Sequence, residues 1–105
     1  MRKIDQYKKE IWKLVVAAEN EKEAKMLLED LLTPAERDAI AERWQVVKLL
    51  SEGKTQREVA KELGVSIQKV SHGAAWLRDS KGFKYFLNFH ERTGKSYEHV
   101  RRTFL

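Results

Sequence analysis

The stretch from Thr55 to Arg78, TQREVAKELGVSIQKVSHGAAWLR, constrains the fold of this 105-residue chain more than any other part of it. Thr55, followed three residues later by Glu58, matches a capping box and predicts the start of a short helix. Gly64 is expected to end that helix, because glycine adopts the left-handed conformation that a tight turn needs. Ser66 suits the N-cap of a second helix that runs to about Arg78. Two short helices joined by about three residues are typical of a helix-turn-helix.

The residue types inside this stretch meet the packing demands of a helix-turn-helix. Ala60 is small enough to let the second helix cross the first one closely. Apolar residues at the spacings needed to join the two helices are Val59, Leu63, Val65, Ile67 and Val70. At about 100° per residue, the second helix has a predicted core side made of Ile67, Val70, Ala74 and Leu77. The same projection puts Trp76 far from this core side, together with Lys69, His72 and Gly73.

The rest of the chain also has helical spacing of its apolar residues. One amphipathic helix is predicted from Ile4 to Ala18 and another within residues 20–32. A third begins after the N-cap Thr33, with proline at its first position and Glu36 completing a capping box. It is expected to end at Gly53, and its predicted apolar side is Ile40, Trp44, Val47 and Leu50 or Ser51. A helix from residue 81, a break at Gly94 and a last short helix complete an all-α chain of five to seven helices.

Length and composition limit the remaining possibilities. A chain of 105 residues supports one core, so we expect a single helical domain over residues 1–105. There is no cysteine and therefore no disulfide or thiolate metal site. No apolar run is long enough for a membrane span and no signal peptide is visible, which favours a cytoplasmic protein without membrane contact. Residues 54–105 hold eleven basic and five acidic residues, a balance that attracts phosphate backbones.

Insertion of the second helix into a major groove would place its exposed residues on base edges. Gln68 suits adenine, Lys69 suits guanine or a phosphate, and Ser71 suits either kind of partner. Arg57 and Lys61 on the preceding helix suit phosphate contacts. The full predicted DNA-binding set is Gln56, Arg57, Lys61, Ser66, Ile67, Gln68, Lys69, Ser71 and His72.

Two segments, LLTPAERDAIAERW and LLSEGKTQREVAKELGVSIQKVSHGAAWLR, form a pattern much more specific than a general helix-turn-helix. Over about Leu31 to Arg78 they resemble the tryptophan repressor superfamily. The resemblance implies an all-helical homodimer whose N-terminal helices, about residues 2–52, intertwine and form the dimer. It also implies that two helix-turn-helix units, about residues 55–78, meet successive major grooves of a double-stranded DNA operator.

The resemblance also implies an effector site. In that family, L-tryptophan lies between the core and the reading helix with its indole between two arginines, and Thr33 and Arg43 match two of the ligand-contacting positions. Where the second arginine would lie this chain has His72, followed by Gly73, and where a ligand-binding serine would lie it has Trp76. Histidine is mostly neutral at pH 7 and lacks the guanidinium fork, and the indole of Trp76 is large enough to fill the space of the ligand ring. The predicted effector set is Thr33, Arg43, His72, Gly73 and Trp76, with L-tryptophan, another ligand or none as the effector.

The sequence therefore predicts a sequence-specific DNA-binding transcriptional regulator, a repressor of the tryptophan repressor type. The alternative is a helical protein-interaction module that uses the same scaffold without operator recognition. An enzyme is not predicted, because TGKS at residues 93–96 has Phe89 where a phosphate-binding loop needs glycine. The histidines have no metal-ligand spacing. The basic C-terminal extension, about residues 81–105, would add phosphate contacts through Lys95, Arg101 and Arg102 or cap the dimer.

Overall fold

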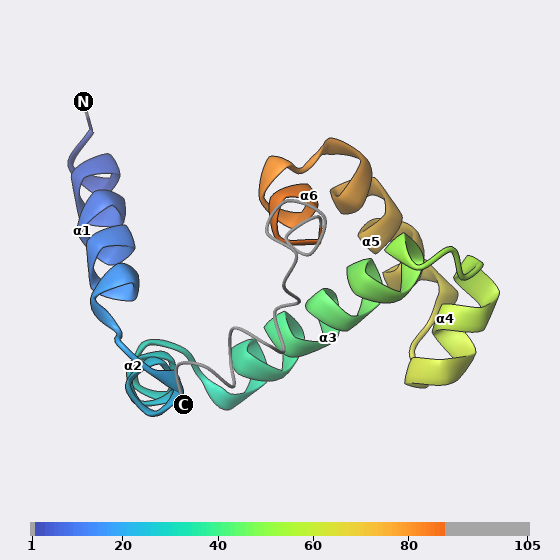
Figure 1. The fold of residues 1–105 in the computed structure, drawn as a ribbon, viewed down its shortest axis with the longest axis horizontal. Helices are drawn as coiled ribbons and strands as arrows, with labels where there is room; N and C mark the ends of the chain where they lie inside the picture. The colour runs from blue at the N-terminus through green and yellow to red at the C-terminus, as the bar shows by residue number, and fades with distance from the viewer. Residues whose placement is uncertain (1, 88–105) are drawn as a thin grey trace. The chain divides into compact units, whose positions relative to one another are not determined.

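The computed structural model describes residues 2–87, which consist of helices and short connections (Figure 1). In chain order the helices are α1 (Lys3–Ala17), α2 (Glu21–Leu31), α3 (Pro34–Ser51), α4 (Gln56–Leu63), α5 (Ile67–Asp79) and α6 (Lys81–Leu87). The all-α prediction is therefore confirmed over these residues. Gly94 and the predicted last helix lie outside the described residues. Residues 2–37 and 38–87 belong to two separate compact units, and the prediction of a single domain stays a prediction.

The first unit contains α1, α2 and the first turn of α3, and hydrogen bonds at helix ends organise it. The side chain of Asn20 accepts the N–H of Glu23 at 2.9 Å at the start of α2. At the start of α3, the Thr33 N–H donates to Glu36 Oε1 at 2.8 Å and the Glu36 N–H donates to Thr33 Oγ1 at 3.2 Å. This confirms the capping box predicted for α3. Arg37 then donates to the Glu29 carbonyl at 2.9 Å and so connects the start of α3 to the end of α2.

The apolar sides of α1 and α2 are not covered within the described part of the chain. Neither helix has a buried residue. On the apolar side of α1 the exposed fractions are 47% for Ile4, 56% for Tyr7 and 46% for Val15. Most of the stability of an amphipathic helix in a protein comes from packing of its apolar face, so these helices need a surface that this unit does not supply.

The second unit has a small core where the C-terminal half of α3 meets α4 and α5. Its buried cluster consists of Val46, Leu49, Val59 and Val70, and the partly buried residues packed on it are Leu50, Ala60, Leu63 and Val65. On α3 the buried side is Val46, Val47 and Leu49, whereas Ile40 is 47% exposed. The predicted apolar side of this helix was therefore wrong at Ile40 and omitted two core residues. The spacing of apolar residues identified the helix, but α4 and α5 decide which of its sides is covered.

The helix-turn-helix has the predicted local structure. Thr55 and Glu58 form a capping box at the start of α4. Gly64 has φ +66° and the turn is closed by the Val65 N–H, which donates to the Ala60 carbonyl at 3.1 Å. The hydroxyl of Ser66 accepts the N–H of Lys69 at 3.2 Å and caps α5. The helix boundaries of this motif could thus be predicted from sequence because short-range hydrogen bonds determine them.

Candidate nucleic-acid interface and effector site

The N-terminal end of α5 presents several of the residues predicted to read DNA. Ser66, Gln68 and Ser71 are exposed there. Ile67 is 48% exposed, so the prediction that it faces the core is wrong. Ile67 is the first residue of α5, and Val65 and Val70 supply the apolar contacts on either side of it. The helix end therefore carries one exposed apolar side chain beside polar ones, a mixture that suits a base-pair edge with its methyl and polar groups.

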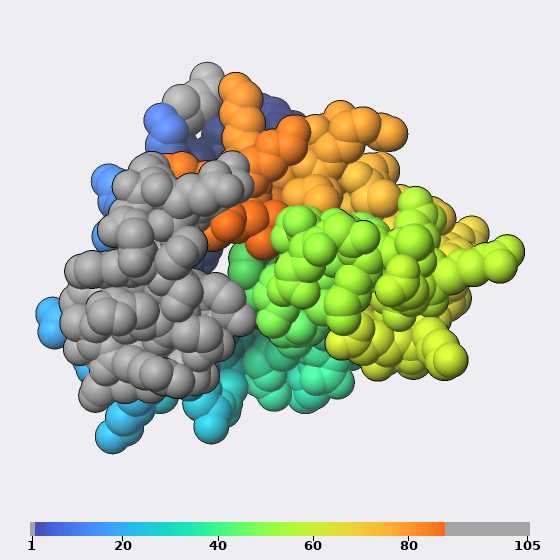
Figure 2. All heavy atoms as spheres, turned by 45° about the vertical axis from the view of Figure 1, so that its right-hand side comes forward, coloured from blue at the N-terminus to red at the C-terminus, as the bar shows by residue number. Residues whose placement is uncertain are grey.

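The neighbouring surface of α4 carries the residues predicted to contact phosphates. Gln56, Arg57 and Lys61 are exposed. The hydroxyl of Ser71 donates to Gln56 Oε1 at 2.8 Å and so connects α5 with the start of α4. In Figure 2, the yellow-green and yellow side chains of α4 and the adjoining end of α5 form an outward surface. Eight of the nine predicted DNA-binding residues lie on α4 and α5, and the ninth, Ser66, caps α5.

The other side of α5 faces α3, which the helical projection did not predict. Lys69 Nζ lies 3.0 Å from Glu42 Oε1, so the ammonium group is directed toward α3. Gly73 is buried, and a Cβ atom at this position would overlap Cγ1 of Val46. The projection placed Gly73 away from the core side of α5, and in the structure this side packs against α3. A projection of one helix gives angles between its residues, but it does not give the position of the neighbouring helix.

Aromatic and cationic groups gather at the C-terminal half of the same side of α5. The guanidinium carbon of Arg43 lies 4.4 Å from the ring centroid of Trp76, which is 39% exposed. The ring of His72 is centred 6.3 Å from that of Trp76 at 53°. Four predicted effector residues, Arg43, His72, Gly73 and Trp76, thus lie on or beside the α3–α5 contact. Thr33 lies in the other unit, where its hydroxyl caps α3.

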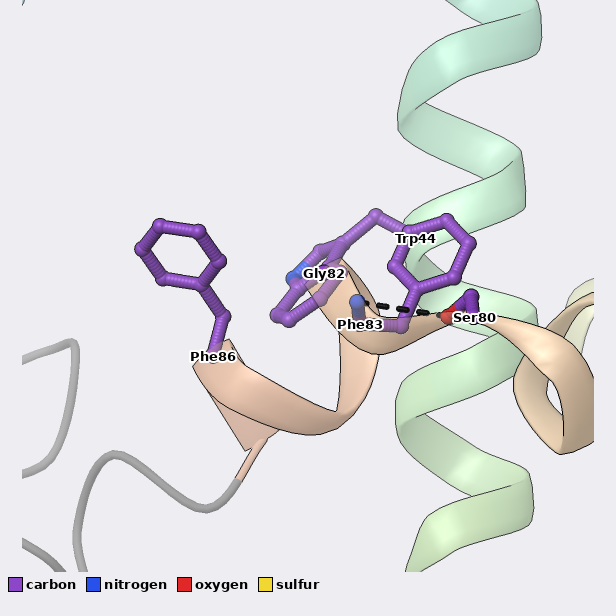
Figure 3. Close-up of a pocket in the computed structure, with 5 residues that line it drawn as sticks. All are labelled: Trp44, Ser80, Gly82, Phe83 and Phe86. Carbon is purple, nitrogen blue, oxygen red and sulfur yellow. Dashed lines mark hydrogen bonds between the residues drawn. The ribbon is translucent and has the colours of Figure 1, made fainter.

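Two neighbouring pockets lie in the second unit beside this group. One of about 340 Å³ is lined by Arg43, Ala75, Trp76, Asp79, Ser80 and Phe83. The other, of about 490 Å³, is lined by Trp44, Ser80, Gly82, Phe83 and Phe86 (Figure 3).

In the second pocket the rings of Trp44 and Phe83 are 6.2 Å apart and tilted by 36°, and the Phe83 N–H donates to Ser80 Oγ at 3.3 Å. The first pocket is lined by two residues of the predicted effector set, Arg43 and Trp76, whereas the second pocket was not predicted from the sequence. The aromatic residues three apart in KGFKYF were the available signal, but they were assigned only to a helix.

Two charged groups near helix starts have shifted pKa values. Hydrogen bonds from the backbone and side chain of Thr33 hold the pKa of the Glu36 carboxyl below its ordinary value of 4.5. The hydrogen bond to Glu62 raises the pKa of Lys54, whose Nζ lies 2.6 Å from Glu62 Oε2. Lys54 precedes the cap of α4 and Glu62 lies near its end, so this pair holds the loop before the helix-turn-helix against α4.

Within residues 2–87, no helix is long and apolar enough to cross a membrane. No group of three or more histidine, aspartate or glutamate residues in that range is placed to hold a metal ion.

Comparison with known proteins extends the match beyond the helix-turn-helix. The family model described as Trp repressor protein matches residues 6–91. The Trp operon repressor homolog of Xylella fastidiosa (strain M23) is 38% identical over 69 residues, covering 65% of this chain and 75% of that protein. The Trp operon repressor homolog of Chlamydia trachomatis serovar L2 is 34% identical over 82 residues, covering 72% of this chain and 87% of that protein. No solved structure shows a significant match to the chain.

Proposed function

Since the chain belongs to the Trp repressor protein family, we propose that it is a repressor that binds a double-stranded DNA operator sequence-specifically as a homodimer. Membership in this regulatory, non-enzymatic family makes it a repressor-like DNA-binding regulator. The specific recognition of an operator and the dimeric state are the parts that we propose.

One observation carries the proposal, namely the geometry of α4, the turn and α5. Val59 and Val70 are fully buried between the two helices. The left-handed turn at Gly64 and the cap at Ser66 then leave the N-terminal end of α5 uncovered. The recognition helix of a helix-turn-helix contacts base edges with its N-terminal residues, so this end of α5 is the surface that we assign to the major groove.

The exposed side chains divide between base reading and phosphate contact. We assign Gln68 to a base, since its amide can form two hydrogen bonds with adenine. Arg57 and Lys61 on α4 are assigned to phosphates. Lys69 is paired with Glu42 at 3.0 Å, so it would contact DNA only after exchanging that carboxylate for a phosphate or a base.

The exposed apolar side chains of α1 and α2 support the homodimer. Ile4, Tyr7 and Val15 lie on one side of α1 and are 47%, 56% and 46% exposed. A large exposed apolar surface marks an interaction site, and a second copy of the chain brings a matching apolar surface by symmetry. Two symmetric reading heads would recognise an operator with dyad symmetry.

Selection of bound duplexes from random DNA tests the proposal. We expect a dyad-symmetric consensus and a binding affinity for it that falls by about 10³-fold or more between about 50 mM and 200 mM salt. Recovery of no preferred sequence, with binding no stronger than to an unrelated acidic polymer, would contradict operator recognition. That result would instead favour a protein-interaction module on the same scaffold.

Two single variants separate base reading from phosphate contact. Gln68→Ala should cost about 1–3 kcal/mol of discrimination at one base position and leave binding to random DNA nearly unchanged. Arg57→Gln should weaken binding to all duplexes alike and lower the salt slope by about 1. Gln6→Ala, on α1, is the matched control for Gln68→Ala. Unchanged base preference in Gln68→Ala would show that α5 is assigned to the wrong face.

A further inference from the structure

The reading helix is attached to α3 through one side. The α5 residues of this contact, Lys69, Gly73 and Trp76, are four and three residues apart and therefore lie on one helical face. Their partners on α3 are Glu42, Val46 and Arg43. Gly73 marks the close approach of the two helices, with Lys69 about one turn before it and Trp76 about one turn after it.

The three contacts differ in how firmly each holds α5. The ion pair of Lys69 is exposed, with side chains that are 62% and 37% accessible, and such pairs contribute little. The glycine permits the approach of the helices but adds no side chain of its own. Trp76 is the largest side chain in the contact, and its ring lies against the Arg43 guanidinium at 4.4 Å. Tryptophan is the most favourable ring for a cation–π contact, and arginine is the cation found most often in such contacts.

The stacking leaves no room for a second ring on the same face of Arg43. At 4.4 Å from guanidinium carbon to ring centroid, the two groups are in contact. His72 lies on the same helix with its ring 6.3 Å from the indole. The 340 Å³ pocket lies beside these groups, so a free aromatic molecule would either bind next to Trp76 or have to displace it.

We infer that the indole of Trp76 acts as a built-in effector. By stacking on Arg43 it holds α5 against α3 in the DNA-reading position, so that operator binding needs no free aromatic ligand. This inference rests on the proposed operator recognition. If α5 is already held in the DNA-reading position, the protein binds with the full affinity of its binding-competent state. If α5 is mobile, only a fraction of the molecules is competent, and the apparent affinity is multiplied by that fraction.

The test uses the full chain and the duplex recovered by selection, with and without millimolar L-tryptophan or indole. The wild-type dissociation constant should change less than about two-fold with either compound. Trp76→Ala should bind the duplex roughly ten-fold more weakly, which corresponds to about 1.4 kcal/mol. Indole should restore much of that loss because it can occupy the vacated place on Arg43. A merely structural role for Trp76 would give a loss that free indole does not repair.

Arginine variants provide a test that leaves Trp76 in place. Arg43→Gln removes the stacking partner and should weaken operator binding by about two- to five-fold, as expected for an exposed cation–π pair. Arg78→Gln is the matched control, because it removes the same charge from an exposed residue of α5 whose nearest acid is Asp79 at 3.6 Å. Equal losses in the two variants would mean that only net charge matters, and would overturn the inference.

The remaining outcomes are also distinguishable. A ten-fold gain in wild-type affinity with L-tryptophan or indole would overturn the inference while leaving operator recognition intact. Unchanged binding by Trp76→Ala, or a loss that indole does not restore, would overturn it as well. Thermal unfolding followed by circular dichroism would show whether Trp76→Ala folds. If it does not fold, the comparison of Arg43→Gln with Arg78→Gln tests the inference. Failure of the wild type to select any duplex would instead be a failure of the proposed function.

Discussion

The buried glycine of α5 allows a quantitative test of the α3–α5 contact. In Gly73→Ala the new methyl group would overlap Cγ1 of Val46 and lie 3.4 Å from its Cβ. Val46 is 2% exposed, and its branched side chain has essentially one favourable rotamer in a helix. The methyl group can therefore be accommodated only if the two helices move apart or the valine leaves its rotamer. Overpacking of this kind costs about 1–3 kcal/mol.

A second effect of the substitution opposes the first. Alanine is more favourable than glycine in a helix interior by about 1 kcal/mol. If overpacking costs about 2 kcal/mol, the net loss in the free energy of unfolding should be about 1 kcal/mol. Gly82→Ala is the control, since Gly82 lies on α6 and a Cβ atom there would meet nothing within 4 Å. This control variant should be as stable as the wild type or slightly more stable.

A double-mutant cycle isolates the contact itself. Val46→Ala alone should cost about 2 kcal/mol, because it removes two buried methyl groups. In the double variant, the methyl group introduced by Gly73→Ala would fill part of the space left by the valine, so the coupling should be about 1–2 kcal/mol in favour of the double variant. Urea unfolding followed by circular dichroism measures all four proteins. A fully additive cycle, or a Gly73→Ala variant that gains stability like the control, would refute the close approach of α3 and α5.

Three further predictions concern helix ends and the turn, all measured by urea unfolding. Gly64→Ala should lose about 1–2 kcal/mol because φ is +66°, and Gly64→Asn should lose less; equal losses would argue against strain. Ser66→Ala should lose about 1 kcal/mol with its N-cap bond, whereas no loss would mean that the cap is not needed. Glu36→Gln tests the lowered pKa of Glu36. Above pH 4.5 the charged Glu36 carboxylate stabilises the fold, so the wild type should have a higher free energy of unfolding than Glu36→Gln. This difference should disappear as the pH falls through the lowered pKa of Glu36. A difference in the free energy of unfolding that stays constant at acidic pH would contradict the hydrogen bonds with Thr33.

The parts of the fold that follow from short-range chemistry could be predicted from the sequence. The capping boxes at Thr33 and Thr55, the left-handed Gly64 and the Ser66 cap each depend on residues within four positions of one another. These capping and turn residues form the same local hydrogen bonds in any fold. The helix-turn-helix and the boundaries of its two helices therefore followed directly from the order of residues.

The side of α5 that faces α3 could not be predicted in this way. Ile67 was assigned to the core side, and the packing of the Gly73 side on α3 was not predicted, because the projection uses only the period of one helix. Glu42 and Val46 were not identified, although they contact Lys69 and Gly73 from the middle of α3. The small residues in HGAA were the available signal, since a glycine inside a helix often marks a close approach. Which neighbour makes that approach is a tertiary property.

The contact of Trp76 with Arg43 also makes the intrinsic fluorescence of Trp76 a reporter of the packing of α5 on α3. Trp12 is 63% exposed within one chain, Trp44 lies beside Phe83, and Trp76 lies against a cation. Because indole fluorescence depends on the polarity and charge of the surroundings, the three tryptophans should differ in emission maximum and in quantum yield. A variant that keeps only Trp76 would report, without any attached dye, whether α5 is packed on α3 or has moved away from it.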